Sequence, residues 1–255
     1  MTMTTGYQPP RPLRRSLTRP VKRAYAQAYL QGARLRGLWV VHLLHIGKTG
    51  GNAIRNGLAI RKGRPRRFPG GVVIQEPHDV TLEMLPAGEA VAFTVREPLE
   101  RFVSAFWHRY RKGKGGQEDW SAGEARAFAR FTTPNMLAEA LSAPDVLARQ
   151  AAVEAMRAIE HICDPLAFYL ISPDYLRARR SDIIDIGFVT ELDRHFETLA
   201  RTLKAEAVPG LPRDSRGANR TPAAFSRELS PAAVAELQKW YAVDLELYAV
   251  CCELA

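Results

Sequence analysis

The chain has 255 residues, of which 46% are hydrophobic and 25% are charged. This composition excludes a disordered or fibrous protein, and the length suits one globular domain or two small ones. Three cysteines cannot form a disulfide framework and match no metal-ligand spacing, which argues against structural zinc and predicts a reducing compartment, the cytoplasm. The longest apolar run, 38–46, is far shorter than the roughly 20 residues that a membrane-spanning helix needs.

Charge is distributed unevenly along the chain. The net charge is +9, but the first acidic residue is Glu76, and residues 1–75 carry 15 lysines and arginines. The rest of the chain carries 21 basic and 27 acidic side chains, a balance of −6. This asymmetry predicts an anionic partner for the first third of the chain.

The N-terminal segment 1–20 combines four prolines with four arginines and has no apolar periodicity. It predicts a disordered basic arm ahead of a single domain at 21–255. Apolar residues at helical spacing predict a short amphipathic helix over 21–35. An organellar transit peptide is also Arg-rich and poor in acidic residues, but no obvious cleavage site follows here.

From residue 38 onward, strand patterns alternate with helix patterns. The aliphatic run 38–45 predicts a buried strand, and a glycine loop leads from it into a helix over 52–60. Further strands are predicted at 72–75, 90–95 and 183–189, a basic loop at 61–67, and helices at 98–111, 121–130, 134–141, 144–161, 190–205 and from Ser230 to near the end. The alternation predicts an α/β fold with a mainly parallel central sheet and helices on both faces. Such sheets bind ligands beyond the carboxyl ends of their strands.

The glycine loop, HIGKTGGN at 45–52, lies where a strand gives way to a helix. Backbone N–H groups and the positive end of the helix dipole converge there, and Lys48 adds a full charge. Glycines allow a close approach of an anion, while Thr49 and Asn52 supply side-chain donors. We interpret the loop as an anion cradle; a tight turn is the structural alternative. A Walker A loop would need glycine where His42 stands, so a nucleoside-triphosphate loop is missing.

A second feature follows the strand at 90–95. Arg96 stands at the carboxyl end of that strand, and Ser104 lies about two turns into the next helix. Each alone has a structural reading, because Arg96 can pair with a neighbouring glutamate and serine is common in helices. Together with an anion cradle on the same sheet edge, they indicate a ligand with phosphates at two ends.

The two motifs carry a family resemblance. Residues 45–51 resemble the 5′-phosphosulfate loop, and residues 95–104 resemble the 3′-phosphate motif, of sulfotransferases that use 3′-phosphoadenosine-5′-phosphosulfate (PAPS). The similarity is greatest to the branch with HIPKTGG-type loops, which includes carbohydrate sulfotransferases; Gly47 replaces its usual proline, and Asn52 its usual threonine or serine. Weaker similarities lie at 219–221 and at 241–248.

The resemblance implies a P-loop-like three-layer fold, PAPS as co-substrate and no metal. It implies transfer to a hydroxyl of an acceptor, and it favours a carbohydrate over a small phenol. The residues that it places against the co-substrate are Gly47, Lys48, Thr49, Gly50, Gly51, Asn52, Arg96 and Ser104.

Sulfuryl transfer requires charge stabilisation on the leaving phosphate and a base for the acceptor proton. Lys48 meets the first need by neutralising the bridging oxygen. For the base, His78 is favoured because it follows the carboxyl end of the strand at 72–75; Glu76, His45 and His108 stay open as alternatives.

Other side chains are assigned by their position in the predicted elements. Two further histidines are expected in the core or just behind the site (His42) and on a helix surface (His195). The basic loop 61–67 suits either an acidic acceptor or solvent. Three aromatic residues suit either stacking on an acceptor or helix packing: Trp107, Tyr110 and Trp120.

Two other functions fit parts of the sequence. A small-molecule kinase would need a complete Walker A loop and a magnesium-binding aspartate at a strand end, and neither is visible. A nucleic-acid-binding protein would use the basic first third, but no recognition module is evident, so no nucleic-acid partner is expected. The sequence indicates neither the oligomeric state nor the identity of the acceptor.

Overall fold

The computed structural model describes residues 18–212, 222 and 224–255. Within this range the chain forms two compact units. The sheet unit comprises 18–96, 169–212 and 247–255; the helical unit comprises 97–168, 222 and 224–246. The predicted arm falls outside the described residues up to 17, as does the predicted late motif at 219–221. The prediction of a single domain at 21–255 stays a prediction.

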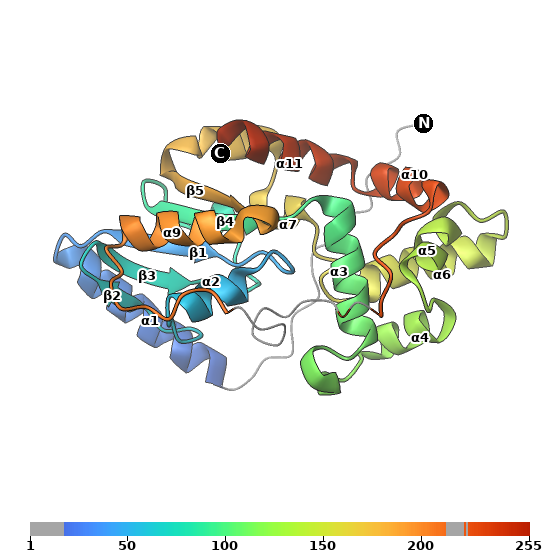
Figure 1. Ribbon diagram of the computed structural model, residues 1–255, viewed down its shortest axis with the longest axis horizontal. Helices are drawn as coiled ribbons and strands as arrows, with labels where there is room; N and C mark the ends of the chain where they lie inside the picture. The colour runs from blue at the N-terminus through green and yellow to red at the C-terminus, as the bar shows by residue number, and fades with distance from the viewer. Residues whose placement is uncertain (1–17, 213–221, 223) are drawn as a thin grey trace. The chain divides into compact units, whose positions relative to one another are not determined.

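The sheet unit contains five strands: β1 (Val40–Leu44), β2 (Arg66–Phe68), β3 (Gly71–Gln75), β4 (Ala90–Val95) and β5 (Ile183–Phe188). Their order across the sheet is β2-β3-β1-β4-β5 (Figure 1). Every pairing is parallel except that of β2 with β3, which is antiparallel. The predicted mainly parallel sheet is therefore confirmed.

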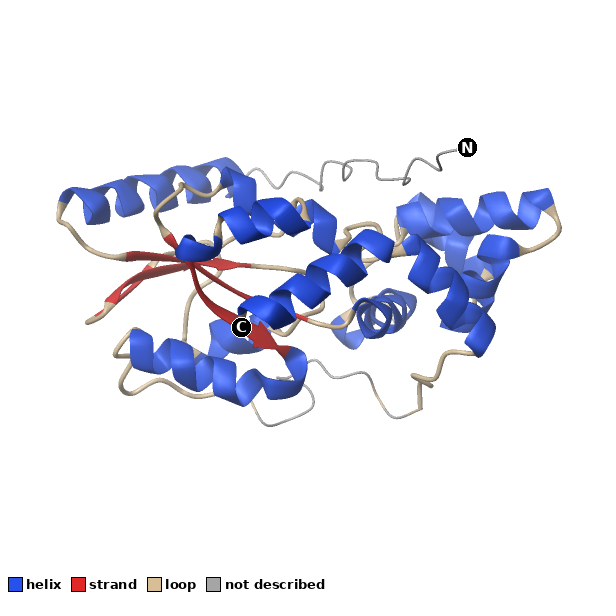
Figure 2. Ribbon diagram, turned by 90° about the horizontal axis from the view of Figure 1, so that it is seen from above, coloured by secondary structure: helices blue, strands red, loops and turns tan. Residues whose placement is uncertain are grey.

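Helices cover both faces of this sheet, which Figure 2 shows with the strands in red. Alternate residues of β1 point to opposite faces, as the twofold period of a strand requires. Val41 packs in a core with Ile54 of α2 (Gly51–Gly57) and Phe196 of α9 (Leu192–Thr202). Its neighbour Val40 packs on the other face with Leu30 of α1 (Thr18–Leu35). This arrangement confirms the α/β, P-loop-like three-layer fold.

Two short helices and the end of a longer one complete the sheet unit. They are α7 (Leu166–Leu170, shared with the helical unit), α8 (Pro173–Ala178) and the last residues of α11 (Ala242–Leu254). Tyr248 of α11 packs edge-on against Phe188 at the end of β5. None of the described helices is long and apolar enough to cross a membrane.

The helical unit has its own core. Its helices are α3 (Pro98–Tyr110), α4 (Ala122–Arg130), α5 (Pro134–Glu139), α6 (Val146–Ala158), α10 (Pro231–Trp240) and the start of α11. Aromatic rings dominate the packing: Phe106 of α3 is fully buried and meets Phe128 of α4 edge to face at 5.5 Å. A buried ion pair, Arg109 with Glu124, joins the same two helices. Short 3₁₀ turns lie at Leu82–Met84, Lys114–Gly116, Ala140–Ser142, Arg180–Asp182 and Val189–Glu191.

Several predicted boundaries were wrong for local reasons. α1 begins at Thr18, so the predicted arm is too long by three residues. The basic loop 61–67 contains the start of β2, whose arginines hid its strand character. The single predicted terminal helix is two helices that meet at Tyr241. The helix predicted from residue 190 begins instead at Leu192, after a 3₁₀ turn at Val189–Glu191, and it has no side-chain cap.

His195 was expected on the surface of its helix, and this was wrong. It is 4% exposed and forms an ion-pair contact with Asp185 of β5. Its ring fills the space beside Gly187, where an added Cβ would collide with the imidazole. A polar helix face was assumed to mean solvent, whereas here the polar face meets an aspartate on the sheet.

Candidate functional site

The site is built on the loop between β1 and α2, residues 45–50, at the carboxyl end of β1. Two of its residues adopt left-handed backbone conformations, Lys48 with φ 68° and Gly50 with φ 89°. Glycine accepts this conformation freely, but for a lysine it costs on the order of 1–3 kcal/mol. The rest of the loop must therefore hold Lys48 in place.

Thr49 anchors the loop to the sheet through its buried side chain. Its side chain is buried, and its hydroxyl donates to the Ile46 carbonyl at 2.9 Å. The same oxygen lies 3.0 Å from the hydroxyl of Thr94 on β4. Because the Thr49 proton goes to Ile46, Thr94 must donate to Thr49. The Thr49 hydroxyl is thus engaged within the protein, and the predicted contact of Thr49 with a ligand stays a prediction.

Gly51 opens α2 at a point where no side chain fits. A Cβ on this residue would lie 2.6 Å from Cδ2 of His45, a distance that real Cβ atoms do not show. Its carbonyl accepts a hydrogen bond of 2.8 Å from Nε2 of Gln75 at the end of β3. The glycine at this position therefore allows His45, Gln75 and α2 to meet.

His78 lies in the turn that follows β3 and is held against the loop. Its ring stacks on that of His45 with centroids 3.8 Å apart. Its Nδ1 lies 3.0 Å from the His45 carbonyl oxygen, which can only accept a hydrogen bond, so Nδ1 carries a proton. In a neutral His78 ring, Nε2 is then the nitrogen that can take up a proton.

His45 itself has a strongly altered pKa. Burial opposes its charged form, and the nearby basic side chains of His78, Arg55 and Lys62 act in the same direction, so its pKa lies well below the ordinary 6.5. His45 is therefore neutral at physiological pH. A buried, neutral ring beside His78 adds no charge to the loop and serves as a flat support.

Arg96 extends from the end of β4 toward the same loop. Its Nη1 lies 3.5 Å from the Lys48 carbonyl oxygen, and its side chain is half-buried. Lys48, His78 and Arg96 are thus brought together at the carboxyl edge of the sheet. Ser104, half-buried on α3, belongs to the helical unit, and its relation to Arg96 stays a prediction.

The alternative bases differ from His78 in their surroundings. The Glu76 carboxylate lies 2.7 Å from Nδ1 of His42, and Nε2 of that buried histidine lies 2.7 Å from Glu89. His45 is 9% exposed. His108 is buried on α3 in the helical unit, with Nε2 3.6 Å from a Glu118 oxygen.

The network around His42 extends to α1. Arg34 of this helix donates two hydrogen bonds to Glu89, of 2.5 and 2.8 Å. Burial opposes a charge on His42, but its bonds to Glu76 and Glu89 outweigh burial and raise its pKa. The bond from Arg34 is the main reason that the pKa of Glu89 is lowered. The expectation that His42 lies in the core is confirmed.

Other residues considered for acceptor binding have structural roles. Arg66 donates to the Leu58 carbonyl at 2.7 Å and lies over the ring of Phe68. Trp107 is buried in the helical unit and donates to the Ser226 carbonyl at 2.7 Å, while Trp120 donates to the Arg109 carbonyl at the same distance. These contacts favour packing over acceptor stacking.

Two polar residues of the site were not singled out from the sequence, Gln75 and Thr94. Both are buried near the carboxyl ends of buried strands. A polar residue at such a position in an otherwise aliphatic run is a signal that could have identified them. Among the described residues, no group of three or more His, Cys, Asp or Glu side chains could hold a metal ion.

Comparison with protein families decides the class of this chain. A model described as the sulfotransferase family matches residues 44–249. The chain belongs to the sulfotransferase family. The matched range contains the loop 45–50, His78, Arg96 and Ser104. No match was found among curated proteins or among solved structures.

Proposed function

We propose that this sulfotransferase transfers the sulfuryl group of PAPS to a hydroxyl of a carbohydrate or glycoconjugate acceptor by in-line transfer. The observation that carries the proposal is the meeting of Lys48 and Arg96 at one strained loop, with His78 fixed beside it, in a chain of this family. The residues present fit an anionic co-substrate, because the loop and the first residue of α2 combine a lysine with three glycines. PAPS supplies the activated sulfuryl group.

Lys48 stabilises the charge that develops when the sulfuryl group leaves. A fixed positive charge contributes most where negative charge appears during the reaction, since it costs no reorganisation at that moment. The left-handed backbone of Lys48 is held by the Thr49 bonds, which fix where this side chain begins. No step in this scheme uses a metal ion.

His78 removes the proton of the acceptor hydroxyl. Its Nδ1–H is directed to the His45 carbonyl, so the proton is taken up at Nε2. Stacking on His45 fixes the plane of the ring. A base with a fixed ring and a fixed tautomer loses little rotational freedom when the acceptor binds.

The nucleotide is bound by two groups of residues. The loop residues Gly47, Lys48, Thr49, Gly50, Gly51 and Asn52 hold the 5′-phosphosulfate, and Arg96 and Ser104 hold the 3′-phosphate. We propose the cytoplasm as the location, on the grounds that Cys163, Cys251 and Cys252 are all free thiols.

Calorimetry with 3′-phosphoadenosine-5′-phosphate (PAP) and AMP tests the nucleotide assignment. PAP should bind about tenfold or more tightly than AMP, because a charge-assisted bond to the 3′-phosphate is lost in AMP. Arg96→Ala should remove this difference while leaving AMP binding nearly unchanged. An exposed arginine of α4, Arg126, provides the control, and Arg126→Ala should bind both nucleotides like the wild type. Equal affinities for PAP and AMP in the wild type would contradict the assignment.

The acceptor class needs its own assay. Radiolabelled PAPS incubated with a panel of oligosaccharides and simple phenols should label sugars preferentially. Labelling of phenols alone would overturn the carbohydrate proposal and leave sulfuryl transfer intact. The kinase alternative predicts instead that ATP with magnesium labels an acceptor while PAPS does not.

A further inference from the structure

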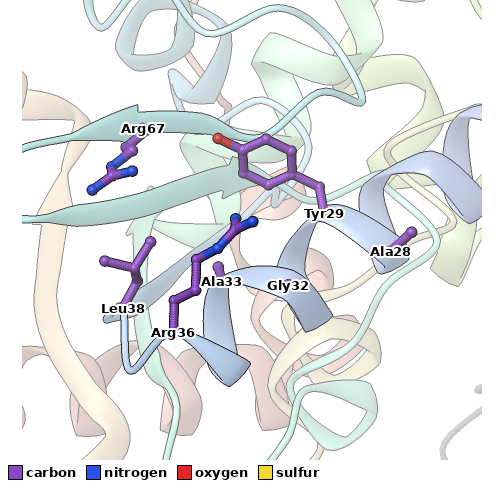
Figure 3. Close-up of a pocket in the computed structure, with 7 residues that line it drawn as sticks. All are labelled: Ala28, Tyr29, Gly32, Ala33, Arg36, Leu38 and Arg67. Carbon is purple, nitrogen blue, oxygen red and sulfur yellow. The ribbon is translucent and has the colours of Figure 1, made fainter.

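The sheet unit contains a pocket that two arginines help to line. Its volume is about 230 Å³, and it lies between α1, the segment leading into β1 and the strand β2. Two guanidinium groups, Arg36 and Arg67, line it together with the ring of Tyr29, as Figure 3 shows. Small residues of α1, among them Gly32, also line it. We call it the Arg36–Arg67 pocket.

The two arginines differ from their neighbours in having no partner among the described residues. Arg34, two residues before Arg36, is paired with Glu89. Arg66, the neighbour of Arg67, donates to backbone carbonyls. Neither Arg36 nor Arg67 forms an ion pair or a side-chain hydrogen bond with any residue that the structure describes. Two guanidinium groups without such partners thus line the same pocket.

The electrostatic surroundings favour an anion there. Residues 1–75 contain no acidic side chain, and the acidic residues that contact α1, Asp79 and Glu89, are already paired with Arg23 and Arg34. Guanidinium groups recognise oxyanions through paired N–H donors, and the Tyr29 hydroxyl offers a further donor. The pocket is smaller than the roughly 300–1,000 Å³ of typical small-molecule sites, so it fits one anionic group and part of its carrier.

The pocket is separate from the loop that holds Lys48. Leu38 precedes β1, and Arg67 pairs with Val72 near the start of β3. The loop 45–50 follows the other end of β1. The Arg36–Arg67 pocket therefore lies near the amino ends of the parallel strands, and the loop 45–50 lies at their carboxyl ends. This separates the pocket from the proposed site of sulfuryl transfer.

We propose that the Arg36–Arg67 pocket binds the oxyanion of a sulfate or phosphate monoester. Such a group has the charge and the acceptor oxygens that two guanidinium groups and a phenol hydroxyl require. Its carrier is either a soluble sugar or a lipid headgroup, which share this chemistry. The inference does not depend on the transfer reaction, because it concerns binding alone.

Calorimetry with glucose 6-phosphate and glucose 6-sulfate tests binding of a soluble sugar ester. Co-sedimentation with phosphatidylcholine vesicles, with and without phosphatidylinositol phosphate, tests binding of a lipid headgroup. Arg36→Ala and Arg67→Ala should each weaken binding about tenfold or more, since each removes a charge-assisted contact. Gly32→Leu should block the pocket without disturbing the helix, because a Cβ at Gly32 would meet no atom within 4 Å. The control is Arg23→Ala, which removes an equal charge from an exposed position on the same helix.

The proposal is supported if the three pocket variants lose binding while Arg23→Ala and Lys48→Ala retain it. If the pocket variants lose binding only to the vesicles, the ligand is a lipid headgroup. If they lose binding only to the sugar esters, the ligand is a soluble ester. Binding that is abolished by Lys48→Ala would place the anion at the loop and overturn the proposal. An equal loss in Arg23→Ala would show general charge attraction and would overturn it as well, as would an absence of binding in both arms.

Discussion

Lys48 places a full positive charge in the loop 45–50, and its own backbone is in the left-handed conformation. We predict that Lys48→Ala lowers kcat by roughly 10²-fold or more, as the loss of one group that stabilises developing charge does elsewhere. PAP affinity should fall much less, since the charge contributes most during transfer. Steady-state kinetics and calorimetry on the same variant give the two values.

A second substitution separates charge from backbone strain at this position. Lys48→Gly relieves the left-handed strain but also removes the charge, so its kcat should be as low as that of Lys48→Ala. Lys239→Ala, at an exposed position of α10, serves as the control. If Lys48→Gly restored turnover, the effect of Lys48→Ala would come from strain and the charge would have no role.

Nδ1 of His78 lies against the His45 carbonyl, and the proposed base is Nε2 of the same ring. We predict that His78→Asn lowers kcat by about 10²-fold, because an asparagine amide can still donate to the His45 carbonyl but cannot take up a proton. The rate of the wild type should rise with pH as the imidazole becomes neutral, and the variant should lose this rise. PAP affinity should be unchanged in both.

A merely positioning His78 would give a different result. His78→Asn would then keep most of its turnover, because its donor to the His45 carbonyl is retained. Glu76→Gln is the matched comparison, since Glu76 stands close to His78 in the chain and contacts His42. If Glu76→Gln abolished turnover and His78→Asn did not, the base would be Glu76.

At the scale of elements, α1 is joined to the sheet by the bonds of Arg34 to Glu89 and of Glu89 to His42. The pKa of His42 is raised above its ordinary 6.5, so its contribution to stability is fully present below about pH 6.5 and is lost as the pH rises through the folded-state pKa. The pKa of Glu89 is lowered below its ordinary 4.5, so its contribution is present above that pH and is lost in acid. The network is most stabilising between these two limits.

Urea unfolding across this range checks the sign. At pH 6 we predict that His42→Gln lowers the free energy of unfolding by about 1.5–3 kcal/mol, the value of hydrogen bonds to charged groups. This difference from the wild type should shrink as the pH rises toward 9, because the wild-type imidazole then loses its proton. A difference that stays constant or grows with pH would contradict the charged form of His42.

The elements that could be predicted were those with one clear pattern. β4 was predicted at 90–95, where it lies, because an aliphatic run ends at Arg96 and Pro98 opens the next helix. β2 was missed because an edge strand of three residues with two arginines shows neither length nor alternation. α10 and α11 carry a single apolar stripe, and their break at Tyr241 depends on tertiary contacts that no local pattern contains.

The same contrast applies to the site. The loop and Arg96 could be singled out from the sequence because glycines and basic residues are unusual directly after buried strands, where packing alone does not require them. The pairing of His78 with the His45 carbonyl and of Thr49 with Thr94 was not visible, because both join residues that are far apart in the chain. His195 was misplaced for a related reason: its partner, Asp185, lies on a strand that no helical period can reveal.

At the scale of the whole molecule, the two units have separate cores. Phe106→Ala in the helical unit should lower the free energy of unfolding by about 3–5 kcal/mol, since this ring is fully buried. If residues 21–255 form one domain, as the sequence predicts, hydrogen exchange should quicken equally in β1, β3 and β4. Leu147→Ala, at a position 69% exposed, is the control and should change little. Unchanged protection of these strands in Phe106→Ala would show two independent domains.

The sheet has one further consequence, for the order in which the newly made chain can fold. β4 and β5 are hydrogen-bonded neighbours, yet the whole of 97–168 is synthesised between them. Pairings between segments so distant in sequence slow folding, because a long loop must close before any contact rewards it. While the ribosome makes this segment, β4 has an unfilled edge with unpaired N–H and C=O groups, which can pair with other chains. We therefore expect the nascent chain to be more prone to aggregation before β5 emerges than after β5 has paired with β4.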